Sequence, residues 1–105
     1  MEYDWGSSDP NCLIAALTGK QATRYAELWM GTHPRGPSKI QGGISLQAYL
    51  GGELPFLYKL LCVEKALSIQ LHPNKQEAEQ LHSTKPNIYG DPNDKPEMFL
   101  ALTDF

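Results

Sequence analysis

The sequence of 105 residues lacks several features that would direct its interpretation elsewhere. It has no excess of basic residues, because nine Lys and Arg stand against twelve Asp and Glu, for a net charge of −3. A groove or patch that binds nucleic acid or an anionic membrane needs such an excess, so we expect neither partner. There is no internal repeat or low-complexity tract. With 41% apolar and 20% charged residues, the composition excludes a collagen-like chain, a coiled coil and a fully disordered tail.

Cysteines and long hydrophobic runs are also scarce. Cys12 and Cys62 lie fifty residues apart and form no Cys-x-x-Cys pair, so they predict two reduced, buried thiols in a cytoplasmic protein rather than a disulfide framework. The most apolar stretch, residues 54–63, is short and carries Lys59, so it is not expected to cross a bilayer. The first six residues are polar and acidic, which is unlike a signal peptide.

Prolines, glycines and capping residues divide the chain into short elements. Helices are expected where a capping residue precedes an apolar periodicity: from Asp9-Pro10 to Gly19, from Ser45 to Leu50, and from Asn74 to Thr84. Strands are expected where aromatic, leucine-rich or alternating residues run between turn signals. These segments are residues 24–31, 55–63, 66–72 and 97–103.

The most informative segment is the alternating stretch of residues 66–72. In a strand, Ser68, Gln70 and His72 share one face, while Leu67, Ile69 and Leu71 share the other. An amide oxygen and an imidazole two residues apart can converge on one metal ion, and Glu97, at the start of the last strand, could add a carboxylate. The same pattern also fits a plain polar strand face, so the spacing alone leaves both interpretations open.

Three longer blocks carry a family resemblance. They are YAELWMGTHPRGPSKI (residues 25–40), LPFLYKLLCVEKALSIQLHPNK (residues 54–75) and DKPEMFLALTDF (residues 94–105), preceded by the opening YDWG. In order and content they resemble the type I mannose-6-phosphate isomerases. The resemblance implies a zinc-dependent aldose–ketose isomerase that interconverts mannose 6-phosphate and fructose 6-phosphate and feeds GDP-mannose synthesis. It also implies a mainly β, cupin-like jelly roll, present in part, with short α-helices.

Residue roles follow from the resemblance position by position. Gln70, His72 and Glu97 match three zinc ligands of the family, while its fourth ligand, a histidine, and a catalytic arginine come from later segments. Ser68 matches a pocket serine, and Lys95 matches an active-site lysine linked to substrate binding or proton transfer. Trp5 and Glu27 match the wall of the substrate pocket or its support. Residues 1–105 are therefore expected to be the N-terminal part of the catalytic domain.

One position departs from the family pattern. Asp94 stands where the family usually has a histidine, a proposed participant in proton transfer, and a carboxylate is ordinarily a much weaker base than an imidazole. The other polar candidates are interpreted as structural: His33 as a loop residue, and His82, Lys75, Glu77 and Glu79 as helix surface. Glu27 could equally be a satisfied buried carboxylate, and Trp5 part of a core.

Alternative functions remain open at this stage. Instead of contributing to an isomerase, the chain could be a non-catalytic, cupin-like segment that binds metal or a partner chain. The substitution at Asp94 also raises the option of a degenerate pseudoenzyme. No dinucleotide-binding fingerprint is present, and an isomerisation requires no hydride carrier.

Overall fold

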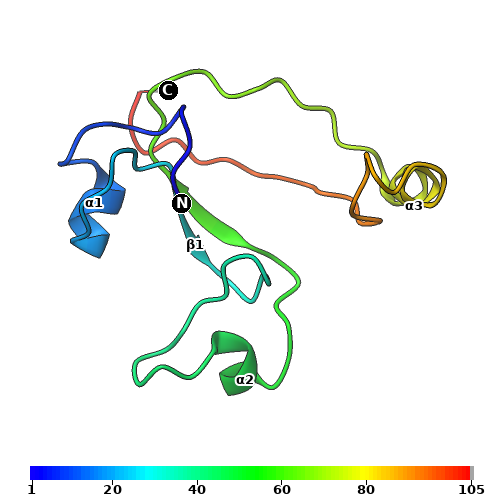
Figure 1. Ribbon diagram of the computed structural model, residues 1–105, viewed down its shortest axis with the longest axis horizontal. Helices are drawn as coiled ribbons and strands as arrows, with labels where there is room; N and C mark the ends of the chain where they lie inside the picture. The colour runs from blue at the N-terminus through cyan, green and yellow to red at the C-terminus, as the bar shows by residue number, and fades with distance from the viewer. Residues whose placement is uncertain (105) are drawn as a thin grey trace. The chain divides into compact units, whose positions relative to one another are not determined.

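A computed structural model describes residues 1–104 of the chain (Figure 1). The elements follow in the order α1 (Leu13–Thr18), β1 (Glu27–Met30), α2 (Leu46–Leu50), β2 (Tyr58–Leu61) and α3 (Lys75–Thr84). They divide into two compact units, Met1–Leu67 and Ser68–Phe105. No helix in the described part of the chain is long and apolar enough to span a membrane.

The strands of the first unit form one antiparallel pair. β1 and β2 pair in the register that sets Glu27 opposite Leu61 and Met30 opposite Tyr58, so both central strand predictions are confirmed in position but with narrower limits. Isolated bridges join Gly6 to Val63 and Ser7 to Tyr25, which adds the N-terminal segment to this ladder. Gly6 is needed there, because a Cβ at this position would lie 2.8 Å from Ala26 Cβ.

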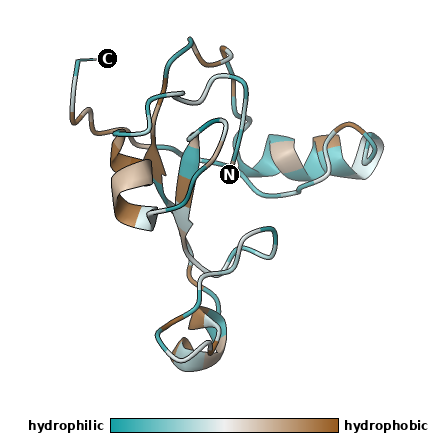
Figure 2. Cartoon of the chain, turned by 60° about the vertical axis from the view of Figure 1, so that its left-hand side comes forward, coloured by the Kyte–Doolittle hydropathy of each residue, from teal (hydrophilic) through white to brown (hydrophobic). Residues whose placement is uncertain are grey.

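A small core lies between α1 and the strand pair. Its buried members include Ile14, Ala15 and Tyr25, and the half-buried side chains packed against them are Cys12, Ala22, Leu28, Leu60 and Cys62. Hydropathy colouring shows the apolar character of α1 (Figure 2). The Tyr25 hydroxyl remains satisfied because it donates to Lys20 O at 3.0 Å and accepts from Ala22 N at 3.2 Å.

The predicted helix ends are confirmed in most details. Ser45 caps α2 by accepting from Ala48 N at 3.1 Å, and Gly19 ends α1 in the left-handed conformation, with φ of 61°. α3 begins with the predicted capping box, in which Asn74 and Glu77 exchange hydrogen bonds of 3.0 and 3.1 Å. The start of α1 differs, since its N-cap is Cys12.

Asp9 does not cap α1, because its carboxylate accepts a hydrogen bond within the turn that precedes the helix. Asp9 Oδ1 accepts from Asn11 N at 2.8 Å, which makes a local turn before the helix. Aspartate side chains form such turns as readily as they cap helices, and a following proline favours both. The helix therefore begins three residues later than the sequence predicted.

Two predicted strands are wrong for the described residues. Segments 66–72 and 97–103 carry no strand assignment, and the alternating apolar side chains there lie open to solvent: Ile69 is 104% exposed, Leu71 96% and Met98 96%. A strand requires ladder hydrogen bonds to a neighbour, and none pairs with these segments within residues 1–104. Each of the two described strands has four residues, whereas α1, α2 and α3 have six, five and ten. The chain is thus not mainly β in its described part.

Glu64 anchors the N-terminal segment of the first unit. Its carboxylate accepts from Ser8 N at 2.6 Å, from Ser8 Oγ at 2.8 Å and from Arg24 Nη1 at 2.9 Å. These donors, the Ser8 backbone N–H first among them, lower the pKa of Glu64 from 4.5 to about 2. The ionised carboxylate therefore stabilises the folded arrangement.

We expect the Glu64→Gln variant to be less stable than the unchanged chain at neutral pH and equally stable in acid. Because the folded pKa is depressed, the stabilisation is complete above pH 4.5 and is lost as the pH falls toward 2. Thermal unfolding of both proteins across this range tests the prediction, with exposed Glu2→Gln as a control. A difference that persists unchanged at low pH would contradict it.

Candidate metal centre

Three polar side chains of the second unit follow one another along the segment that leads into α3. Gln70 Nε2 donates to Ser68 Oγ at 2.9 Å, and Gln70 Oε1 lies 3.3 Å from His72 Nε2. The predicted common face of these residues is therefore present although the strand ladder is not. Extended backbone alone places every second side chain on one side.

Glu97 approaches the same imidazole from a distant part of the sequence. Glu97 Oε2 lies 3.7 Å from His72 Nδ1, and the other carboxylate oxygen lies 3.3 Å from Lys95 Nζ. About a third of the His72 and Glu97 side chains is exposed, at 27% and 35%. Through these contacts the structure links His72 to Gln70 and Glu97 directly, and to Ser68 and Lys95 through them.

The spacing of these donors can be compared with a zinc site. Two ligand atoms at about 2.1 Å from a tetrahedral ion lie about 3.4 Å apart, close to the 3.3 Å between Gln70 Oε1 and His72 Nε2. Glu97 faces the opposite ring nitrogen, the position of the carboxylate that commonly orients a metal-bound histidine. The carboxylate ligates the same ion only if the ring or the carboxylate turns. All three side chains suit zinc in chemical type, and the Gln70–His72 pair also suits it in spacing.

The amide oxygen is an essential part of this donor set. Among the side chains of residues 1–104, no group of three or more His, Cys, Asp and Glu gathers where it could hold a metal ion. The cluster holds one imidazole and one carboxylate and is completed by Gln70. Such a mixed nitrogen and oxygen set suits zinc and also other divalent ions.

A shallow, open hollow adjoins the cluster within the second unit. Its volume is about 270 Å³, and its lining is contributed by His72, Pro73, Asn74, Asp94, Lys95 and Pro96. Asp94 and Lys95 are both exposed, so a carboxylate and an ammonium group stand beside His72 with access to solvent. A small molecule in this hollow would lie beside the Lys95 ammonium, the Asp94 carboxylate and the His72 imidazole together.

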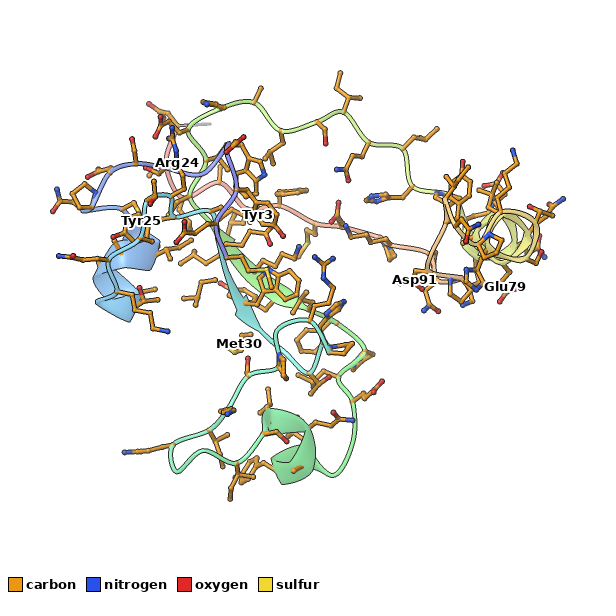
Figure 3. The ribbon with its side chains drawn as sticks, viewed as in Figure 1. Tyr3, Arg24, Tyr25, Met30, Glu79 and Asp91 are labelled. Atoms are coloured by element: carbon orange, nitrogen blue, oxygen red, sulfur yellow. The ribbon has the colours of Figure 1, made fainter. Side chains whose placement is uncertain are left out.

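Lys75 contacts the loop that leads to Asp94 and Lys95, and the sequence did not predict this contact. Lys75 Nζ donates to Asn93 Oδ1 at 2.8 Å, while Asn93 N and Nδ2 donate to Asp91 Oδ1 at 2.9 and 2.8 Å. The loop carrying Asp91 runs beside α3 (Figure 3). Lys75 is therefore more than helix surface, although it also pairs with Glu79 at 3.6 Å.

For a zinc ion held by the cluster around His72, we expect Lys75→Met to weaken binding about tenfold, since outer contacts that orient metal ligands typically contribute 10–100-fold to affinity. Without the Lys75–Asn93 hydrogen bond, the loop holds Glu97 less firmly near His72. Competition with a chromophoric chelator measures the affinity. Lys85→Met, at the other end of α3, is the matched control and should bind as the unchanged chain does. Equal affinities for the two variants would refute a positioning role.

Glu27 and Trp5, the remaining predicted site residues, belong to the first unit. Glu27 Oε2 accepts from Trp29 Nε1 at 2.5 Å, and Glu27 Oε1 lies 3.4 Å from Lys59 Nζ. The Glu27 side chain is only 11% exposed and has both carboxylate oxygens paired, which fits a structural carboxylate and also a support of the pocket wall. Lys59 Nζ also lies 4.8 Å from the Trp29 ring centroid.

Trp5 is half-buried and stacks on Tyr3, with ring centroids 5.4 Å apart. Its backbone oxygen accepts from Glu64 N and Lys65 N, so the residue is fixed mainly through its main chain.

His33 lies edge-on to Trp29 and accepts from Arg35 N at 3.1 Å. These contacts agree with a loop histidine of structural role.

Comparison with known proteins identifies the class to which this chain belongs. Residues 1–105 match the catalytic domain of type I phosphomannose isomerase over their whole length, so the chain belongs to that family. Among its relatives is mannose-6-phosphate isomerase of Bos taurus, 44% identical over 131 residues, with 99% of this chain and 31% of the relative covered. The mannose-6-phosphate isomerase of Emericella nidulans is 43% identical over 128 residues, covering 98% of this chain and 28% of the relative.

A solved structure is similar as well. It is a crystal structure of a histidine-to-alanine mutant of phosphomannose isomerase from Salmonella typhimurium, with a TM-score of 0.66 and 34% identity over 90% of this chain and 31% of that one. The chain thus spans about a third of the length of the relatives it matches. The match to the bovine protein runs over 131 residues, more than this chain has, so the relative carries extra residues inside the matched region.

Proposed function

We propose that this chain supplies the N-terminal part of the active site of a zinc-dependent mannose-6-phosphate isomerase. The reaction interconverts mannose 6-phosphate and fructose 6-phosphate in the cytoplasm and feeds GDP-mannose synthesis. The observation that carries the proposal is the position of His72 between Gln70 and Glu97, in a chain that belongs to this family throughout. Gln70, His72 and Glu97 are the proposed zinc ligands.

The chemistry assigns roles to the neighbouring residues. Isomerisation moves a proton between C1 and C2 of the open-chain sugar, so it needs a base and a group that stabilises negative charge on the adjacent oxygens. Zinc bound to these ligands supplies Lewis-acid polarisation of those oxygens. Asp94 accepts the proton, and the Lys95 ammonium attracts the anionic substrate and neutralises charge at the hollow they share.

The remaining residues have supporting roles in the proposal. Ser68 orients the Gln70 amide, since its hydroxyl accepts from Gln70 Nε2 while Gln70 Oε1 points toward His72 Nε2. Trp5 and Glu27 contribute to the wall of the substrate pocket or to its support. The exposed apolar residues of segments 66–72 and 97–103 support the further proposal that these segments are strands of a cupin-like jelly roll in the whole enzyme.

A chimeric enzyme tests the proposed function. The matched region of the Bos taurus isomerase is replaced by this chain, and mannose 6-phosphate isomerisation and zinc content are measured on the purified chimera. Turnover above that of the Gln70→Ala, His72→Ala double variant of the same chimera is the expected result. A folded chimera that holds one zinc ion per chain but has no turnover would overturn the catalytic proposal.

That second result would favour the non-catalytic alternative. The residue that favours this alternative is Asp94, because an aspartate stands at the position where the family usually has a histidine. A chain with intact metal ligands and a weakened proton acceptor can keep the metal site while losing the reaction. Zinc retained without turnover therefore separates a metal-binding segment from an isomerase.

A further inference from the structure

The amine of Lys95 has an unusual set of neighbours for an exposed lysine. Its side chain is 58% exposed, and its Nζ lies 3.3 Å from Glu97 Oε1. Lys95 also lines the open hollow of about 270 Å³, together with Asp94 and His72. An accessible amine therefore stands beside two carboxylates and an imidazole, all of them in the second unit.

The other two lysines of the second unit lack part of this environment. The Lys75 side chain is 50% exposed, and its Nζ lies 3.6 Å from Glu79 Oε1, so Lys75 shares both exposure and a carboxylate neighbour with Lys95. It does not line the hollow, however, and its amine donates to Asn93 Oδ1 at 2.8 Å. Lys85 is exposed and takes part in none of the ion pairs of residues 1–104. The hollow thus distinguishes Lys95 from both.

A lysine amine in such a place can react with the carbonyl carbon of an open-chain sugar. Lysine and carbonyl compounds condense to an imine with loss of water. The imine of an aldose becomes a stable ketoamine only when a proton moves from C2 to C1. A base beside the amine accelerates this step, which is the same displacement of a proton that converts an aldose into a ketose.

We propose that Lys95 is a covalent modification site for aldose phosphates, at which Glu97 catalyses the rearrangement of the first imine. The Lys95 ammonium and the aldehyde form a protonated imine, because two hydrogens of the ammonium leave with the carbonyl oxygen as water. Glu97 takes the proton from C2, the C2–H electron pair forms the C1–C2 double bond, and the electrons of the C=N double bond move to nitrogen. The acid then returns the proton to C1. The proton of the C2 hydroxyl passes to nitrogen, and C2 becomes a carbonyl.

The choice of sugar rests on the proposed function, which brings mannose 6-phosphate to this hollow. The reactivity of Lys95 rests on the contacts of the second unit and requires neither a metal ion nor turnover. A sugar phosphate joined to Nζ occupies the hollow beside His72 and Asp94. The adduct is therefore a slow block of the proposed site, formed from its own substrate.

Incubation of the intact chain with mannose 6-phosphate tests the proposal, with a chelator present to exclude metal ions. Dialysis reverses the unrearranged imine, and borohydride reduction, digestion and mass spectrometry then measure the ketoamine at each lysine. The initial rate at Lys95 should exceed the rates at Lys75 and Lys85 at least about tenfold, a part of the 100-fold or more that a positioned base contributes. In concentrated urea, which removes the hollow, the three rates should become equal.

Matched variants identify the base. Glu97→Gln should lower the rate at Lys95 to that at Lys85, whereas Glu79→Gln, which removes the carboxylate beside Lys75, should leave the rate at Lys95 unchanged. Equal rates at the three lysines of the folded chain would overturn the proposal, and so would a preference for Lys95 that persists in urea. Neither result bears on the isomerase, which is decided by turnover of the chimera, and an inactive chimera leaves the expected rates at these lysines as they are.

Discussion

Replacing His72 with alanine is expected to lower the zinc affinity of the chain by at least about 100-fold, beyond the upper range for residues that only orient ligands. His72 is the one side chain that contacts both other proposed ligands, Gln70 at 3.3 Å and Glu97 at 3.7 Å. Its loss leaves an amide and a carboxylate without the nitrogen donor that favours zinc over harder ions. Isothermal titration with zinc, and cobalt absorption as an independent readout, measure the change.

The chain provides a matched control on the same unit. His82, in the last turn of α3, is another half-buried imidazole, and its Nδ1 lies 2.6 Å from Tyr89 O. The His82→Ala variant should bind zinc as the unchanged chain does. Both variants are best compared in a background where Cys12 and Cys62 are serine, because thiolates also bind zinc. Equal loss of affinity for the two histidine variants would show that zinc is held without a defined site.

Local signals in the sequence were sufficient for most helix ends and for the strand pair β1–β2, but not for the start of α1. Ser45, Asn74 and Glu77 act within three residues of themselves, so their hydrogen bonds could be predicted without knowledge of the fold. The order of Gln70 and His72 on one side followed equally from the period of extended backbone. These features depend on neighbours along the chain.

Features that depend on distant partners were not predictable in the same way. Alternation in residues 66–72 indicated a strand, but a ladder also needs a neighbouring strand, and periodicity carries no information about one. Lys75 was interpreted as helix surface because its partner, Asn93, is eighteen residues away in a loop. The packing of Cys12 and Cys62 against the same small core likewise arises from the position of α1 on the strand pair. Spacing of fifty residues gave no indication of it.

Restoring a histidine at position 94 is expected to raise the isomerase turnover of the chimera about tenfold. Asp94 lines the same hollow as His72 and Lys95, where the proposed reaction requires a proton acceptor. An imidazole is ordinarily a stronger base than a carboxylate by about two to three pKa units. Since the efficiency of general-base catalysis follows base strength, Asp94→His should increase kcat at neutral pH while zinc content remains one per chain.

The opposite substitution makes this prediction decisive. Asp94→Asn keeps the size and polarity of the side chain but removes the proton acceptor, so kcat should fall by at least about 100-fold, the usual contribution of a positioned base. Asp104→His, which adds an imidazole at an exposed site in the same unit, should leave kcat unchanged. If Asp94→Asn retains full turnover, the proton is accepted elsewhere and position 94 only lines the hollow. A rise for Asp94→His together with a fall for Asp94→Asn is expected only if the side chain at this position carries the proton.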